Sequence, residues 1–210
     1  MPVLRVGFVP GVTLTKWRRI WDERFPRFGL DVLAVPEAEQ RAALDDERVD
    51  LCFVRLPLTD AGLHVIPLYE EAPVVVAPKD HPVAVFDEVT LAELGEEDVL
   101  EGFEGGEAMD LVAGGAGVVF VPQSVARSFS RRDLVHRPVA DGVPTRVALA
   151  WLQDNPHEMI QEFVGIVRGR TANSSRTPRP AEPAPAQQPA EPKPRGRRPP
   201  VKRTGGSRRR

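Results

Sequence analysis

Short apolar runs alternate with helical patterns along the first third of the chain. Residues 4–9, 30–35 and 51–54 are apolar and end at polar or turn residues, as strands buried on both faces do. After the first run, apolar residues recur in steps of three and four, which predicts a helix with one buried face. They are Leu14, Trp17, Trp21, Phe25 and Phe28. A second helix is predicted over 37–48, so strands and helices alternate as in a parallel α/β sheet with crossover connections.

The same patterns continue with less regularity to residue 170. Apolar runs predict further strands over 63–68, 73–77, 118–121 and 147–151. Helices are predicted over 90–94, from about residue 122, and over 157–167. Residues 100–110 (LEGFEGGEAMD) are acidic and glycine-rich, with little that could form a core.

Charge divides the chain into two unlike parts. The 210 residues carry a formal net charge of −2, with 28 basic and 30 acidic side chains. Residues 171–210 contain 11 basic and 2 acidic residues, a net charge of +9, and almost no large apolar side chain. Residues 1–170 carry −11. This composition predicts one folded region of one or two lobes, followed by a disordered basic tail over 171–210.

The remaining composition narrows the class of protein. The single cysteine, Cys52, fits a reducing compartment, and no leader or membrane-length apolar run occurs, so a cytoplasmic protein without membrane contact is expected. The four histidines lack metal-ligand spacing. No nucleophile motif or phosphate-binding glycine loop is present. We therefore expect no enzyme activity, no metal and no cofactor.

Several segments, in order, resemble the effector-binding (substrate-binding) domain of the LysR-type transcriptional regulators. They are LRVGFVPG, VDLCFVRLPL, GLHVIPLYEEAPVVVAPKDHP, TLAEL, LVAGGAGVVFVPQSVAR and DLVHRPV with VALAW. The resemblance implies two α/β lobes, like a type 2 periplasmic binding protein, joined by two crossover strands around a ligand cleft. It covers residues 1–170, with lobe I over 1–77 and 147–170 and lobe II over 78–146. Residues 73–77 and 147–151 would lead into and out of the hinge.

The chain departs from the family's pattern in two places. About ten residues between 100 and 111 replace further elements of the second lobe, so a truncated lobe II is expected. The family's N-terminal winged helix-turn-helix is missing before the first strand, which predicts a domain that acts without its own DNA reader.

Three segments are candidates for effector binding. Pro10, Gly11, Val12 and Thr13 form a strand-to-helix turn whose N–H groups could bind a carboxylate, although Thr13 could simply cap the helix. Arg55, followed by Leu56 and Pro57, leaves a buried strand at the edge where open α/β sheets bind ligands. Its guanidinium could hold a carboxylate, or pair with a nearby glutamate.

The third candidate comes from the second lobe. Val121, Pro122, Gln123 and Ser124 end a strand and begin a helix. In the family this segment faces the cleft, so its polar groups could donate to a ligand. An ordinary helix start explains the same residues equally well.

The tail carries a different signal. The segment KPRGRRPPVKR resembles an AT-hook, although Arg198 interrupts the R-G-R-P core. Its basic residues could bind nucleic acid without sequence preference, or could only keep the chain soluble. The candidate nucleic-acid contacts are Arg195, Arg197, Arg198, Lys202 and Arg203.

Two functions follow from these observations. The first is a non-enzymatic sensor of a small molecule, expected to be an anion and more narrowly a carboxylate. It would be linked to transcription through a homodimer or through pairing with a related regulator. The alternative is a nucleic-acid-associated protein that binds through its tail and uses the folded domain as a dimerisation scaffold.

Overall fold

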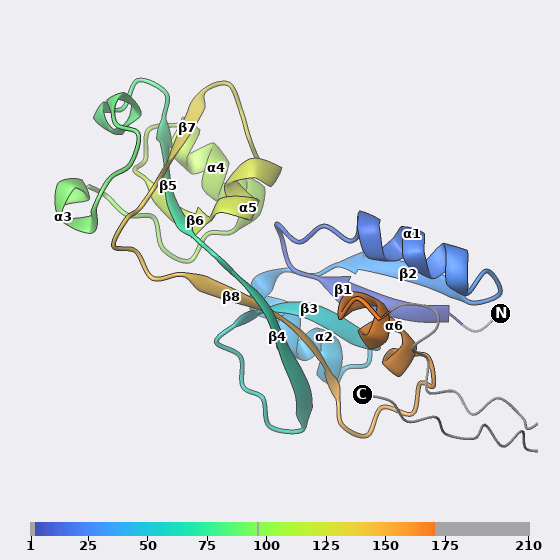
Figure 1. Cartoon of the computed structure of the whole chain (residues 1–210). Coiled ribbons are helices and arrows are strands. Elements are labelled where there is room, and N and C mark those ends of the chain that lie inside the picture. The colour runs from blue at the N-terminus through green and yellow to red at the C-terminus, as the bar shows by residue number, and fades with distance from the viewer. Residues whose placement is uncertain (1–2, 96, 171–210) are drawn as a thin grey trace, which may run out of the picture. The chain divides into compact units, whose positions relative to one another are not determined.

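The strands form two separate sheets in the computed structural model, which describes residues 3–95 and 97–170 (Figure 1). The five strands of the first sheet are β1 Val3–Phe8, β2 Gly29–Ala34, β3 Leu51–Leu56, β4 Leu63–Glu71 and β8 Thr145–Leu152. Their order across the sheet is β2-β1-β3-β8-β4. The second sheet consists of β5 Pro73–Pro78, β6 Val119–Pro122 and β7 Leu134–Pro138, in the order β6-β5-β7.

The direction of the strands corrects the prediction of a parallel sheet. Strand β1 is parallel to β2 and β3, as predicted, but β8 is antiparallel to both β3 and β4. In the second sheet, β5 pairs antiparallel with both neighbours. The reason for the mixed first sheet is that β8 returns to it from the second sheet and therefore enters from the opposite end.

The chain crosses between the sheets twice. Strand β4 continues into β5 through Ala72, and the chain returns over residues 139–144 into β8 (Figure 1). We call the first sheet with its helices the first lobe (3–72 and 145–170), and residues 73–144 the second lobe. The predicted boundary after residue 77 was too late, because Pro73–Pro78 pairs entirely within the second sheet. Strand β8 likewise belongs wholly to the first lobe.

Helices of unequal length cover the sheets. They are α1 Thr15–Arg24, α2 Gln40–Asp45, α3 Leu91–Leu94, α4 Gly105–Ala113, α5 Gln123–Ser128 and α6 Ile160–Val167, with short 3₁₀ turns η1 Glu37–Glu39 and η2 Pro82–Val85. None of the helices in the described ranges has the length and apolar character that crossing a membrane requires.

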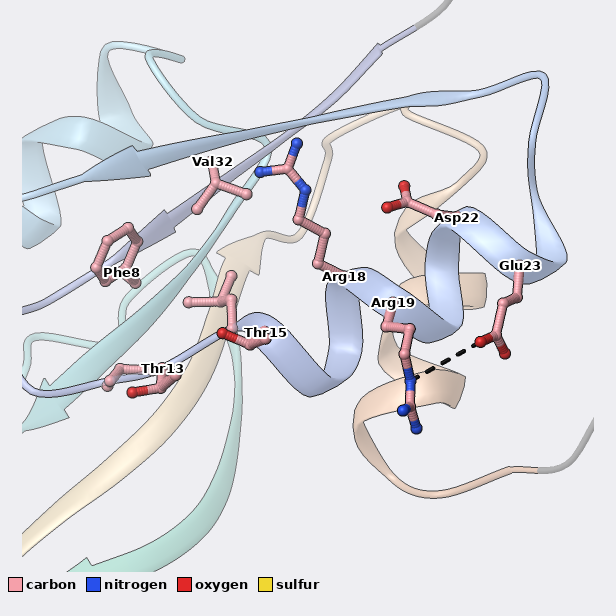
Figure 2. Close-up of a pocket in the computed structure, with 10 residues that line it drawn as sticks. Phe8, Thr13, Thr15, Arg18, Arg19, Asp22, Glu23 and Val32 are labelled. Atoms are coloured by element: carbon pink, nitrogen blue, oxygen red, sulfur yellow. Dashed lines mark ion pairs between the residues drawn. The ribbon is translucent and has the colours of Figure 1, made fainter.

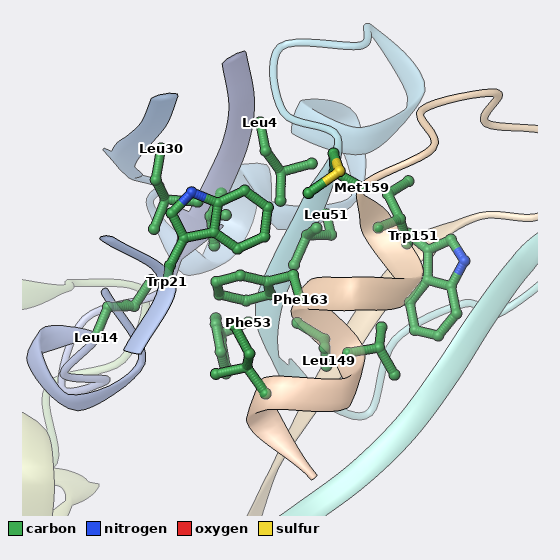
Figure 3. Close-up of a cluster of buried hydrophobic side chains, with 14 of the residues drawn as sticks. Leu4, Leu14, Trp21, Leu30, Leu51, Phe53, Leu149, Trp151, Met159 and Phe163 are labelled. Atoms are coloured by element: carbon green, nitrogen blue, oxygen red, sulfur yellow. The ribbon is translucent and has the colours of Figure 1, made fainter. Parts of the chain in front are cut away.

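The first lobe has one large core and one small core on opposite faces of its sheet. Residues of β3 alternate between them: Leu51 and Phe53 pack with α1 and α6, whereas Cys52 and Val54 pack with α2. Figure 3 shows the larger core, in which Phe163 of α6 lies beside Phe53. The ring centroids of Trp21 and Phe163 are 5.8 Å apart. These buried aromatic side chains anchor the lobe.

The second lobe repeats this alternation with smaller residues. Val74 and Val76 of β5 pack with α4 and α5, and Val75 and Ala77 pack on the opposite face near η2 and α3. The glycine-rich segment was expected to add little core, and this was wrong in part. It begins α4, whose Met109 is 1% exposed. In α4 the buried residues Ala108, Met109 and Val112 lie on one face of the helix, and the glycines and acidic residues beside them gave no clear helical pattern in the sequence.

Two helix starts illustrate the limits of the sequence pattern. Thr90 forms the predicted short helix's cap, with a full capping box to Glu93. The expected cap at Thr13 was wrong, since α1 begins at Thr15 and its N-cap residue is Leu14, without a side-chain hydrogen bond. Thr13 is exposed between buried Val12 and Leu14 and precedes the N-cap residue by one position.

Candidate functional site

Two adjoining cavities lie between the lobes. Their volumes are about 460 and 480 Å³, and they share Pro10, Glu104 and Gly105 in their walls. The first lobe contributes the turn after β1, the start of η1 and Arg55. The second lobe contributes the segment before α4, the end of β6 and residues of α5. We call this pair of spaces the interlobe cavities.

The turn after β1 touches the second lobe directly. Gly11 has φ of 91°, a conformation that disfavours a side chain. A Cβ at this position would lie 2.3 Å from Oγ of Ser124 and 3.0 Å from the backbone nitrogen of Val125. Glycine at position 11 therefore allows the two lobes to approach each other beside the cavities.

Arg55 is held by acidic side chains rather than left free. Its guanidinium donates to Oε2 of Glu37 at 2.7 Å, to Oε2 of Glu71 at 2.9 Å and to the carbonyl of Pro10 at 3.1 Å. The side chain is 2% exposed. Burial by itself lowers the pKa of Arg55, but hydrogen bonds and charge from the two glutamates outweigh it and raise the pKa. Arg55 thus remains charged in the cavity wall.

A second carboxylate of the wall comes from the glycine-rich segment of the second lobe. Oε2 of Glu104 accepts a hydrogen bond from the backbone N–H of Glu37 at 3.1 Å, which links the two lobes. The sequence analysis did not single out Glu104, and it also missed Glu37 and Glu71 as the partners of Arg55. The only sequence signal for Glu104 was its place in an acidic, glycine-rich segment.

The structure brings together most of the predicted effector residues. Pro10, Gly11, Val12, Arg55, Val121 and Pro122 all line the interlobe cavities. Ser124 lies at their edge against Gly11, and its buried Oγ has no hydrogen-bond partner in the part of the chain that is described.

The other predicted residues lie elsewhere. Gln123 lines neither interlobe cavity, and its backbone N–H donates to the carbonyl of Ala72 at 3.1 Å. Leu56 packs on the smaller core of the first lobe, and the peptide bond between it and Pro57 is cis. Thr13 lines a different cavity. The tail residues Arg195, Arg197, Arg198, Lys202 and Arg203 lie outside the described residues.

That different cavity is an open groove along α1 of about 760 Å³ (Figure 2). Thr13 and Thr15 line it, with Phe8 and Val32 from the sheet and the charged side chains Arg18, Arg19, Asp22 and Glu23 of α1. Its ion pair between Arg19 and Glu23 spans 3.8 Å, and both side chains are more than two-thirds exposed. This groove belongs to one lobe and holds no buried charge, so we favour the interlobe cavities as the functional site.

The reactive groups of the described ranges can be taken in turn. Cys52 is buried, and burial raises its pKa to about 12, so its thiolate is suppressed at neutral pH. Within residues 3–95 and 97–170, no three His, Cys, Asp or Glu side chains are grouped to hold a metal ion. The cavity walls offer guanidinium, carboxylate, hydroxyl and aromatic groups, which are suited to recognise a small molecule.

Comparison with known proteins gives the fold a family. The family described as "LysR substrate binding domain" matches residues 2–106 and 104–172. The two matched segments meet in the glycine-rich segment where the second lobe was predicted to be shortened.

Curated relatives are transcriptional regulators that are longer than this chain. The Hca operon transcriptional activator HcaR of Escherichia coli is 25% identical over 203 residues, which cover 81% of this chain and 68% of the relative. The regulator AlsR of Bacillus subtilis is 22% identical, over 78% of this chain and 65% of its own length. A probable hydrogen peroxide-inducible genes activator of Streptomyces viridosporus is 30% identical, over 70% of this chain and 58% of its own length.

Solved structures agree with the predicted two-lobed fold. The BenM effector binding domain with its effector benzoate superposes with a TM-score of 0.66 at 21% identity, over 80% of this chain and 90% of that one. The reduced form of OxyR superposes with a TM-score of 0.64 at 20% identity, over 80% of this chain and 95% of that one. Two α/β lobes joined by two crossings, as in periplasmic binding proteins, are thereby confirmed. The chain belongs to the LysR substrate-binding domain family.

Proposed function

We propose that this chain is a small-molecule sensor whose effector binds in the interlobe cavities. The observation that carries the proposal is the convergence of three distant segments, around Pro10, Arg55 and Val121, on these cavities. Cavities of this size between two lobes, with apolar walls and few polar groups, are typical of small-molecule sites. The BenM domain, which shares the fold, has benzoate as its effector.

The two lobes provide the response to binding. They touch through Gly11 and Ser124 and through the hydrogen bond from Glu37 to Glu104. A ligand that contacts both walls would favour the closed arrangement by its difference in affinity for the closed and open states. The transcriptional output would follow from that shift, through a homodimer or a related regulator as partner.

The test compares two glycine variants of the full chain by thermal shift. A panel of small acids, amines and neutral aromatic compounds is added to the wild type, Gly11→Ala and Gly62→Ala. Both glycines have positive φ, 91° and 75°, but a Cβ at position 62 would meet nothing within 4 Å. The two variants therefore share the backbone strain and differ in lobe contact.

The expected result is a ligand-induced rise in melting temperature for the wild type and Gly62→Ala. Gly11→Ala should lose it, because the added methyl group separates the lobes. A ligand that stabilises all three proteins equally would place its site outside the interlobe cavities. Absence of any stabilising compound across the panel, for a protein that melts cooperatively, would contradict the proposal.

Two further expectations stay predictions. Action without a helix-turn-helix would be tested by the size and DNA binding of the natural gene product. DNA binding by the basic tail would be tested by its salt dependence with and without residues 171–210. Peroxide sensing, suggested by the Streptomyces relative's name, is disfavoured, because the thiol of Cys52 is buried with a pKa of about 12.

A further inference from the structure

We propose that the effector of the interlobe cavities is a cation, an ammonium or amidinium group on an aromatic or aliphatic body. This inference rests on the proposed function and names the ligand class for the same site. It departs from the carboxylate that the sequence predicted, and the reason lies in the charges that the structure places in the wall.

The walls of the cavities carry more negative than positive charge. The ionisable residues that line the two cavities are Glu37, Arg55 and Glu104. Glu71 lies directly behind the wall, 2.9 Å from Arg55. Two of these carboxylates pair with the guanidinium of Arg55, and Glu104 adds a third, so the four side chains have a formal net charge of −2. Carboxylates in the wall repel a negatively charged ligand, so the cavities should disfavour an anion.

Arg55 is poorly placed to hold a ligand carboxylate. Its two terminal nitrogens already donate to Glu37, to Glu71 and to the carbonyl of Pro10. A bidentate guanidinium–carboxylate pair needs two parallel donors directed at one acceptor group. A ligand carboxylate would have to displace at least one glutamate, and that glutamate would then lie unpaired beside it.

The wall also has hydrogen-bonding groups that lack a partner within the described residues. Glu104 bonds the N–H of Glu37 with Oε2, and its Oε1 has no hydrogen-bond partner in the described ranges. Oγ1 of Thr145 is buried without a partner, and so is Nε of Arg55, whose side chain is 98% buried. An ammonium group can donate to a carboxylate or a hydroxyl oxygen, whereas a hydroxyl or carbonyl oxygen of the ligand would accept from Nε.

The apolar part of the wall defines the body of the ligand. Phe103 and Phe120 line the same cavity, with Val121, Pro122 and Val125 beside them. An aromatic or branched aliphatic body would pack on these side chains. The face of a phenylalanine ring also attracts a nearby cation. Apolar and acidic walls together match a hydrophobic amine.

The experiment is isothermal titration calorimetry of the full chain with three probes of similar shape. They are phenethylamine, 3-phenylpropionate and 2-phenylethanol, which are cationic, anionic and neutral. Each is titrated into the wild type, Glu104→Gln and Glu107→Gln. Glu107 is a matched control, because it is exposed in the first turn of α4 and lines neither interlobe cavity.

Phenethylamine should bind most tightly, and Glu104→Gln should weaken it about tenfold, because a hydrogen bond to a charged group is worth more than a neutral one. Glu107→Gln should leave its affinity unchanged. Binding of 3-phenylpropionate, strengthened in Glu104→Gln, would overturn the cation inference and leave the proposed function standing. Equal phenethylamine affinity in all three proteins would also overturn it. If none of the probes binds, the inference fails, and the wider thermal-shift panel decides the proposed function separately.

Discussion

The two lobes of this chain bury their apolar side chains to different degrees. The first lobe encloses Trp21, Phe53 and Phe163, each 0% exposed, whereas the largest fully buried side chain of the second lobe is Met109. Among the described residues, six of the eight exposed large apolar side chains belong to the second lobe. They are Val85, Phe86, Leu91, Val99, Phe103 and Val143. The second lobe therefore gains less from its own core and depends more on the strands that cross to it.

This difference in core size suits the first lobe to be the stable scaffold and the second lobe to be the part that moves. Burial of large side chains supplies most of the stability of a small domain, so the first lobe should set the global free energy of unfolding. The second lobe, with a smaller core and short helices, should open at lower cost. A ligand between the lobes would then act mainly on the second lobe.

Removal of an aromatic ring from the core of the first lobe should have the largest effect. Phe163→Ala should lower the free energy of unfolding by about 3–5 kcal/mol, because it removes a fully buried ring and leaves a cavity. Urea denaturation of the full chain measures this change. A loss under about 1 kcal/mol would mean that the first lobe does not determine global stability.

The second variant removes one of the partners of Arg55. Glu71→Gln should cost about 3 kcal/mol, because it leaves a buried guanidinium short of one countercharge. Glu70→Gln is the matched control, since Glu70 pairs with Arg146 at the surface, where both side chains are more than half exposed. That change should cost less than about 1 kcal/mol. If both variants lose the same free energy of unfolding in urea denaturation, the buried ion pair of Arg55 contributes no more than the exposed one.

A third variant tests the core of the second lobe. Met109→Ala should lower the free energy of unfolding by about 2 kcal/mol, which is at the low end for such a change. The small core of the second lobe can relax into the cavity that the side chain leaves. Hydrogen exchange should accelerate in α4, β5 and β6, and remain unchanged in β1 and β3. Acceleration throughout both sheets would show that the lobes unfold as one unit.

The smallest expected effect is at the cap of α3. Thr90→Ala removes the capping box with Glu93 and should cost about 1 kcal/mol. Its effect should stay local, with faster amide exchange over 91–95 and no change in the first lobe. Stability equal to that of the wild type would show that α3 contributes nothing to the second lobe.

Local patterns predicted the elements well, because each depends on residues close in sequence. The buried strands, the apolar face of α1 and the short helix after Thr90 all follow from residue spacing or from a short local pattern. The sheet to which β5 belongs could not be predicted in this way. It depends on pairing with β6 and β7, more than 40 residues further along the chain.

The site was predicted in part for the same reason. Three segments that line the cavities were predicted, since each lies at or just after the end of a strand, but the ion pairs of Arg55 depend on Glu37 and Glu71, which are 18 and 16 residues away. Glu104 was missed because an acidic glycine-rich segment gives no sign of which carboxylate will face the other lobe. The predicted segments therefore located the cavities, and tertiary ion pairs determined their charge.

Hydrogen exchange with mass spectrometry can locate the effector between the lobes. The full chain is compared with and without the compound that gives the largest thermal shift. We expect protection in both walls of the interlobe cavities, over 8–12 in the first lobe and over 102–105 and 120–125 in the second. Protection confined to 13–23, along the groove beside α1, would contradict binding between the lobes.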